Sequence, residues 1–277
     1  MKLKEYPISI KESIKLLRYS SHSLKQKNGK EIELIVSFTS IPSRLKAVNL
    51  VVRSLLLQSL RPSKILLWLH RDLRDQVPKN VTRLEGDIFE IRYTPTQSSH
   101  SKLVHTLKEF PGSTIVTCDD DLMYPDNWLE DLYREHLSFP KQVLCNRCNM
   151  IAYDSNGNTL PYKDWVRGIP GGTSSMSIMP AGYGGVLYPP KCMLPIVTDD
   201  NLYFQLAPKA DDLWFKAMSF LKGTPSRRIA NPSSDFIPII GTRKYTLATS
   251  NIKQDGNRTQ WDALRNHFNF KTPDPKL

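Results

Sequence analysis

The stretch Ser113-Thr-Ile-Val-Thr-Cys-Asp-Asp-Asp-Leu-Met-Tyr-Pro-Asp-Asn-Trp128 decides the fold, because a short apolar run stops abruptly in three consecutive carboxylates. Ile115 and Val116 lie among small and polar residues and follow Pro111-Gly112, a pattern typical of a strand buried on both faces. The triplet Asp119 to Asp121 is therefore expected at the carboxyl end of a strand. In open α/β sheets this is the edge at which ligands bind.

Three adjacent carboxylates repel one another unless a cation or strong hydrogen-bond donors compensate them. A divalent metal is the simplest compensation. Asp119 and Asp121 alternate along the chain, so they can place two carboxylates on Mg²⁺ or Mn²⁺, which prefer oxygen ligands and retain substrate phosphates. The other interpretation is a solvated turn before a helix that begins near Asp126, since Asp is common in turns and at helix caps. A cap needs one Asp rather than three.

Strand and helix patterns alternate on the amino-terminal side of the triplet. Apolar periodicity predicts strands over 31–38, 64–69 and 88–93, and helices over 45–59 and 101–109. Such alternation predicts parallel strands joined by right-handed crossovers. We therefore expect an α/β protein, a single Rossmann-like unit with a mostly parallel central sheet flanked by helices.

The 277 residues are enough for one large α/β domain with a substantial core. We expect a basic N-terminal helical segment over 1–30 and a catalytic domain over 31–222. The catalytic domain would have a nucleotide half over 31–140 and an acceptor half over 141–222. The remaining residues, 223–277, would form a C-terminal extension packed on the domain.

Residues 161–188 are rich in Gly, Pro, Ser and Tyr, a composition that predicts a poor core former and a mobile binding loop. The segment leads into Gly182-Tyr-Gly-Gly-Val-Leu-Tyr-Pro-Pro190. Its adjacent glycines, Gly184 and Gly185, allow the backbone to approach a ligand closely, although a plain turn explains them equally well.

A second acidic pair, Asp211-Asp212, opens an apolar-periodic helix. Helix capping and the favourable interaction of an acid with the helix dipole account for one of the two residues. The other is a candidate carboxylate general base, next to Trp214, which we expect to be an exposed indole.

The formal charge of +11 is unevenly spread, because residues 1–30 carry eight Lys and Arg against two Glu. Apolar residues recur at helical spacing among these lysines: Ile10, Ile14, Leu17 and Leu24. One interpretation is an amphipathic basic helix that lies on an anionic membrane surface. The other is a solvated helix packed on the domain.

The sequence also indicates where in the cell the protein is expected. It has no apolar run of about 18 residues, the length that a spanning helix needs, and no signal-peptide pattern of a basic start and an apolar centre. Four cysteines in a chain of this size, without an export signal, are expected to be reduced. We expect a cytoplasmic protein, and the membrane interpretation would place it peripherally at the inner face of the cell membrane.

Three elements in order carry a family resemblance. They are the strand ending in Asp119-Asp-Asp121 with Tyr124-Pro125 after it, the Gly182–Pro190 segment, and Ala210-Asp-Asp-Leu-Trp214. With Ser37-Phe-Thr-Ser-Ile-Pro-Ser-Arg44 on the first strand, the chain resembles bacterial glycosyltransferases of the glycosyltransferase A fold. It is most similar to the family 2-like enzymes that build capsular and lipopolysaccharide glycans. The resemblance covers roughly residues 34–220.

The resemblance implies a donor site around the triplet. Asp119 would face the ribose, and Asp121, assisted by Asp120, would hold a Mn²⁺ or Mg²⁺ ion that bridges the donor diphosphate. Lys102 matches a basic residue near the nucleotide and its phosphates. Three residues after the first strand match the place where such enzymes receive the nucleotide base: Thr39, Pro42 and Arg44.

The resemblance also implies an acceptor side. Gly184 and Gly185 fall where the family's glycine-rich segment lines the sugar pocket. Asp211-Asp212 occupies the place of the family's acidic motif, whose final carboxylate acts as the base in inverting enzymes, so Asp212 is the favoured base. Asp211 stands where the family has the longer Glu. Tyr183 and Trp214 are the candidate acceptor-binding residues.

The function implied is transfer of a sugar, with inversion, from a nucleotide-diphosphate sugar to a glycan or lipid-linked glycan acceptor. Three alternatives remain open. A metal-dependent phosphohydrolase also uses alternating Asp residues after a strand, but usually with a small hydroxylated residue next, where this chain has Leu122-Met123. A nucleotidyltransferase would need a glycine-rich loop that Ser40–Arg44 lacks. A nucleic-acid-binding module is suggested by the sequence pI of 9.4, yet no such motif is present, and we expect no nucleic-acid partner.

Overall fold

The computed structural model describes residues 3–26, 29–233, 236–242, 251–252 and 254–271. The chain divides into two compact units, and the boundary after Arg134 falls inside helix α6 (Trp128–Ser138). The first unit comprises residues 1–134 and 233–245, and the second comprises residues 135–232 and 246–277.

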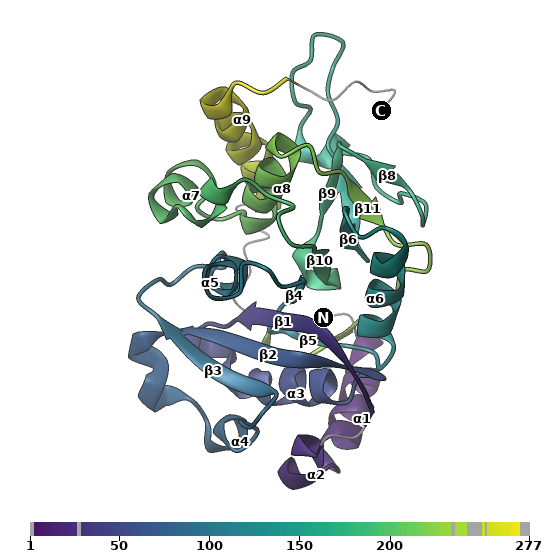
Figure 1. Cartoon of the computed structure of the whole chain (residues 1–277), viewed down its shortest axis with the longest axis vertical. Helices are drawn as coiled ribbons and strands as arrows, with labels where there is room; N and C mark the ends of the chain where they lie inside the picture. Colours follow the sequence, from purple (N-terminus) through teal and green to yellow (C-terminus); the bar gives the residue numbers. More distant parts are fainter. Residues whose placement is uncertain (1–2, 27–28, 234–235, 243–250, 253, 272–277) are drawn as a thin grey trace. The chain divides into compact units, whose positions relative to one another are not determined.

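Parallel strands form the sheet of the first unit, in the order β3-β2-β1-β4. Their bounds are β1 (Lys30–Thr39), β2 (Leu60–His70), β3 (Phe89–Thr94) and β4 (Ile115–Thr117). Helices α3 (Leu45–Leu56) and α5 (Ser101–Glu109) cover opposite faces of this sheet (Figure 1). The expectation of a mixed α/β fold with a mostly parallel sheet flanked by helices is confirmed.

A buried polar network sets the position of α5 on the sheet. The indole Nε1 of Trp68 donates a hydrogen bond to Thr106 Oγ1 (2.8 Å), and the hydroxyls of Thr106 and Ser37 are 2.7 Å apart. Buried polar groups of this kind are costly unless paired, so they favour one register of the helix against β1 and β2. The first turn of α5, which carries Lys102, therefore lies at the carboxyl end of the sheet.

The N-terminal segment forms two helices, α1 (Glu5–Leu17) and α2 (Ser21–Lys25), which pack on α3. Two buried arginines hold them. The Arg53 guanidinium donates to the carbonyls of Leu16 (3.0 Å) and Tyr19 (2.6 Å), where α1 ends, and Arg61 donates to the carbonyls of Leu24 and Gln26. The helices that the structure describes are all too short or too polar to cross a membrane.

Strands of the second unit are short. Strand β6 (Val143–Cys145) pairs antiparallel with β10 (Val186–Tyr188) and parallel with β11 (Ser226–Arg228), and β11 pairs antiparallel with β8 (Ser174–Ser175). Strands β7 (Cys148–Met150) and β9 (Ile178–Pro180) form a separate two-stranded antiparallel sheet. Besides the end of α6, the α-helices in the described residues of this unit are α7 (Asp200–Leu206), α8 (Asp211–Leu221) and α9 (Gly256–Phe268).

The expectation that 161–188 is a poor core former is wrong. The segment contains β8, β9 and β10, and several of its side chains are buried: Trp165, Ile169, Ile178, Met179, Val186 and Leu187. Strands of two or three residues are too short to show a period-two pattern, so the sequence did not reveal them. Gly171 is needed for packing rather than mobility, because a Cβ there would lie 2.3 Å from the carbonyl oxygen of Ala230.

The buried Lys216 in α8 predicts that the stability of the protein depends on pH, which can be tested. Its side chain is fully buried, its ammonium donates to Ser226 Oγ (3.3 Å), and burial lowers its pKa from 10.5 to about 7. The unfolded chain therefore holds a proton that the native protein releases between these values, so stability should rise as the pH increases from 7 to 10.5.

We expect Lys216→Met to be more stable than the wild type at pH 6, by about 2–4 kcal/mol, because the buried charge is gone. The difference should shrink toward pH 10, and urea unfolding at several pH values measures it. Lys222→Met, at an exposed position just after the same helix, is the control and should show no such trend. A pH-independent difference for Lys216→Met would contradict the burial argument.

Candidate functional site

The acidic triplet lies where the sequence placed it, one residue after β4 and at the carboxyl end of the parallel strands. A later segment of the chain, around residues 237–239, also contacts the triplet. Strand β5 (Leu122–Met123) pairs with β12 (Ile237–Pro238), and the N–H of Ile239 donates to the carbonyl of Asp121 (2.9 Å). No local pattern in the sequence indicates this return of the chain to the site.

Asp120 points into the protein and is buried. Its Oδ2 accepts a hydrogen bond from Ser40 Oγ (2.5 Å), and its Oδ1 accepts one from Arg44 Nη1 (2.7 Å). Burial raises the pKa of the Asp120 carboxyl, and Arg44 and Ser40 oppose that rise. Both oxygens of Asp120 thus serve to join the end of β4 to the loop and 3₁₀ turn after β1, η1 (Pro42–Arg44).

Arg44 is positioned by several acceptors. Besides Asp120, its Nη1 lies 3.3 Å from Asp121 Oδ2, and its Nε donates to the carbonyl of Thr242 (3.2 Å). Burial by itself lowers the pKa of this guanidinium, but the two carboxylates outweigh burial and the pKa is raised. The positive charge is therefore directed at the triplet.

The other two acids of the triplet are more accessible. The Asp119 side chain is 34% exposed and that of Asp121 is 23% exposed, compared with 6% for Asp120. Lys102 donates from Nζ to Asp119 Oδ1 (3.0 Å), so α5 supplies a second cation to the cluster. Asp120 and Asp121 lie in the turn between β4 and β5, where the Asp120 side chain is directed inward and those of Asp119 and Asp121 stay accessible.

By themselves, the side chains of the cluster supply only some of the ligands that a hard cation needs. No three His, Cys, Asp or Glu side chains are grouped to hold a metal ion in the part of the chain that the structure describes. Mg²⁺, however, is usually bound through one or two carboxylates together with substrate phosphates and water. The accessible pair Asp119 and Asp121 is sufficient for that kind of site, and two cations against three carboxylates leave one formal negative charge.

Two residues predicted to receive the nucleotide base lie beside this cluster. Thr39 ends β1 and donates from Oγ1 to the carbonyl of Trp68 (2.7 Å), which joins the carboxyl ends of β1 and β2. Pro42 is exposed at the start of η1, a position that suits its fixed backbone angle.

Two residues that shape the cluster, Ser40 and Tyr124, are not among the predicted site residues. The Tyr124 hydroxyl accepts the N–H of Asp119 (2.8 Å), and its buried ring packs on Trp128. Tyr124 was visible as part of the Tyr-Pro motif, but its contact with Asp119 depends on how β5 turns back. Ser40 was visible only as a residue of the loop after β1.

In the second unit, the acidic pair occupies the first turn of α8. Asp212 Oδ2 accepts the N–H of Gly182 (3.0 Å), which ties α8 to the 3₁₀ turn η4 (Gly182–Gly184). Neither acid is the N-cap, because Ala210 occupies that position and makes no side-chain capping bond. The capping interpretation of the pair is therefore wrong, although the helix dipole still favours acids in this turn.

Gly184 and Gly185 each require glycine, for two different structural reasons. A Cβ at Gly184 would lie 2.6 Å from Arg147 Cγ and 2.9 Å from its Cβ, so no side chain fits there. Gly185 has φ +88°, in the region that favours glycine. Between Gly182 and Gly184, Tyr183 is exposed, as a residue that contacts an acceptor must be.

The expectation that Trp214 is an exposed indole is wrong. Its side chain is fully buried, and its Nε1 donates to the carbonyl of Val197 (2.8 Å). A Trp three residues into an amphipathic helix can face either side, and here it packs against Tyr203 (6.2 Å between ring centres). Trp214 therefore stabilises the packing of α8 and is not placed to bind a ligand.

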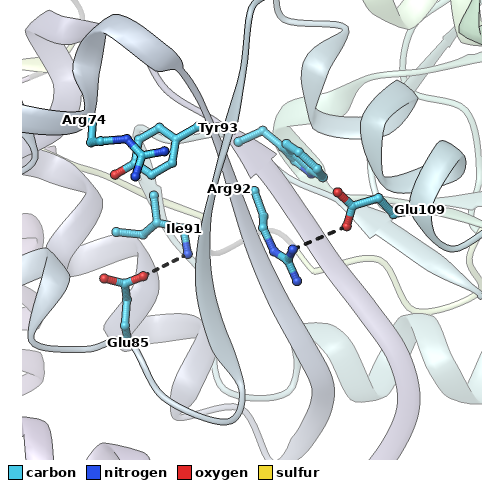
Figure 2. Close-up of a pocket in the computed structure, with 7 residues that line it drawn as sticks. Arg74, Glu85, Ile91, Arg92, Tyr93 and Glu109 are labelled. Carbon is cyan, nitrogen blue, oxygen red and sulfur yellow. Dashed lines mark hydrogen bonds and ion pairs between the residues drawn. The ribbon is translucent and has the colours of Figure 1, made fainter.

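A separate cavity of about 550 Å³ opens around strand β3 of the first unit (Figure 2). The Arg74 guanidinium lies 4.2 Å from the centre of the Tyr93 ring, and Arg92 pairs with Glu109 (3.7 Å). The remaining lining residues are Trp68, Glu85 and Ile91. None of the candidate site residues lines this cavity, so the acidic cluster remains the candidate site.

No protein-family model matches the chain, and neither does any curated protein. Solved structures do show similarity. A 4-diphosphocytidyl-2C-methyl-D-erythritol synthase from Anaerococcus prevotii is 12% identical, with a TM-score of 0.45, over 86% of this chain and 99% of that one. Residues 1–349 of S. aureus TarS are 14% identical, with a TM-score of 0.47, over 88% and 72%. A UDP-glucose pyrophosphorylase from Acinetobacter baumanii is 9% identical, with a TM-score of 0.43, over 87% and 93%. Likeness at this level assigns no reaction to the chain.

The Arg44–Asp120 pair gives a prediction about stability. Removing one partner of a buried ion pair leaves the other charge uncompensated, so we expect Arg44→Met to lower the free energy of unfolding by about 2–4 kcal/mol. Arg134→Met breaks a pair in which the arginine side chain is exposed, with Glu130, and should cost less than about 1 kcal/mol. Urea unfolding of both variants makes the comparison, and similar costs would contradict the structural role of Arg44.

Proposed function

We propose that the chain is a metal-dependent glycosyltransferase that transfers a sugar, with inversion, from a nucleotide-diphosphate sugar to a glycan or lipid-linked glycan in capsule or lipopolysaccharide synthesis. One observation carries the proposal. Asp119 and Asp121 stand more exposed than Asp120 at the carboxyl end of β4, with the cations Lys102 and Arg44 beside them.

On the donor side, Asp121 with Asp119 would hold Mg²⁺ or Mn²⁺, and Asp119 would also face the ribose. A metal in this position stabilises the negative charge that builds on the leaving diphosphate. Lys102 contributes positive charge at the same place, because its ammonium is held 3.0 Å from Asp119. Asp120 acts through Arg44, whose guanidinium it orients.

On the acceptor side, Asp212 would take the proton of the acceptor hydroxyl as that oxygen attacks the sugar in line with the leaving group, which gives inversion. The hydrogen bond from the Gly182 N–H holds the carboxylate in one orientation, as a positioned base requires. Gly184 and Gly185 would line the sugar pocket, and the exposed Tyr183 would contact the acceptor. The proposal includes peripheral contact with an anionic membrane, where lipid-linked acceptors are found.

The test is a screen of nucleotide sugars with the full chain, in Mn²⁺, in Mg²⁺ and in chelator, that measures both melting temperature and nucleoside diphosphate release. A ligand that binds the native state raises the melting temperature by mass action. Metal-dependent stabilisation together with diphosphate release supports the proposal. Release of pyrophosphate from a nucleoside triphosphate and a sugar phosphate would replace it with nucleotidyl transfer, and phosphate release from phosphomonoesters would replace it with phosphohydrolysis.

Asp121→Asn tests the metal role. The change removes one negative charge and keeps the side-chain shape, so we expect loss of metal-dependent donor binding without loss of the fold. Asp126→Asn, at an exposed position in the same segment, is the control and should bind donor normally. Calorimetric titration of the donor with and without metal measures both variants. Unchanged affinity and metal dependence in Asp121→Asn would refute the role.

Asp212→Asn tests the base. The amide oxygen can still accept the Gly182 N–H, so the fold and a donor affinity within a few-fold of wild type should be retained. Turnover should fall by about 10²–10⁴, the usual contribution of a positioned acid–base group. Asp211→Asn should be milder. Near-normal turnover in both variants would show that the base lies elsewhere.

A further inference from the structure

The outer face of α1 carries an apolar stripe exposed to solvent. Tyr6, Ile10, Ile14 and Leu17 follow one another at spacings of four, four and three residues, so they share one side of the helix. Ile10, Ile14 and Leu17 are 49%, 50% and 54% exposed, and Leu3, in the turn before the helix, is 91% exposed. Exposure of this many large side chains in one row needs a physical reason.

The stripe is not the face of α1 that packs on the first unit, because a neighbouring face, about 100° around the helix, already makes that contact. Ser9 and Leu16 are buried, and Ser13 Oγ lies 3.8 Å from Met123 Sδ. Arg53 holds the carbonyl of Leu16, so the helix is docked in one rotation about its axis. The apolar stripe is consequently presented outward by a rigid support.

A row of basic residues runs beside the stripe. Lys4, Lys11, Lys15 and Arg18 each come directly after a stripe residue, Leu3, Ile10, Ile14 and Leu17 respectively. One residue is about 100° around a helix, so the two rows run side by side along the exposed surface. All four basic residues are exposed, and Lys15 reaches Glu12 (3.0 Å).

We propose that α1 lies flat on the surface of an anionic lipid bilayer, with the apolar stripe at the boundary of headgroups and acyl chains and the basic row against the lipid phosphates. Two adjacent rows, one apolar and one basic, are the chemistry that such a surface recognises. A second copy of the chain is a poorer occupant, because pairing through the stripe would bring two basic rows together. The proposal specifies the membrane contact of the proposed function and does not depend on the transfer reaction.

The test is sedimentation of the full chain with phosphatidylglycerol-containing vesicles and with pure phosphatidylcholine vesicles. The wild type should bind the anionic vesicles and lose binding as salt rises, because the screening length falls from about 10 Å at 0.1 M to about 3 Å at 1 M. The double variant Ile10→Asp/Ile14→Asp should reduce the bound fraction at least tenfold. Phe204→Asp is the control, because Phe204 is 44% exposed on another helix, α7, and belongs to neither the stripe nor the basic row.

A bound fraction for Phe204→Asp within about twofold of wild type supports the proposal, and an equal loss in Phe204→Asp and in the double variant would overturn it. Lys4→Gln/Lys11→Gln should weaken binding to anionic vesicles only. Equal wild-type binding to both kinds of vesicle would overturn the charge argument. If the wild type does not bind vesicles but forms a dimer, and the Ile10→Asp/Ile14→Asp change dissociates that dimer, the stripe would be assigned to contact with a second copy. Melting temperatures check the fold, and donor binding measured in parallel shows whether the transfer reaction stands or fails separately.

Discussion

Three carboxylates at the end of one strand must be compensated, and the first unit is arranged around that requirement. Ser40 and Arg44 from the β1 side take the middle carboxylate into the protein, and Lys102 from α5 approaches the first one. Arg44 also holds the carbonyl of Thr242, so a segment from late in the sequence joins the same cluster. The compensation that the sequence argument assigned to a metal is thus supplied partly by protein cations, and a metal would have only the outer pair to bind.

The three adjacent carboxylates differ in their surroundings, because the middle one is buried and the two that flank it are more accessible. A buried, doubly bonded carboxylate contributes order and costs desolvation, which its neighbours offset. The flanking carboxylates keep access to solvent and so can receive ligands. The buried contacts among Trp68, Thr106 and Ser37 fix α5 on the sheet, and Lys102 in its first turn donates to Asp119.

The second unit uses its acidic pair in a comparable way. Asp212 is anchored by the Gly182 N–H, and Asp211 is buried at the start of α8. Trp214 and Lys216, on the same helix, are both fully buried, and burial of the Lys216 amine depresses its pKa to about 7. Helix α8 therefore carries a candidate base in its first turn and a buried lysine, Lys216, one turn later.

The amino-acid sequence by itself determined the α/β alternation, because strands of six or more residues and amphipathic helices leave clear periods. It also located the triplet at a strand end and predicted α5 from Ser101 to Glu109, as observed. Tertiary structure alone decided which carboxylate turns inward, that Trp214 is buried, that 161–188 forms short strands, and that α1 exposes its apolar stripe. These outcomes depend on contacts between residues distant in the chain, such as Ser40 with Asp120 or Arg53 with Leu16, which no local pattern records.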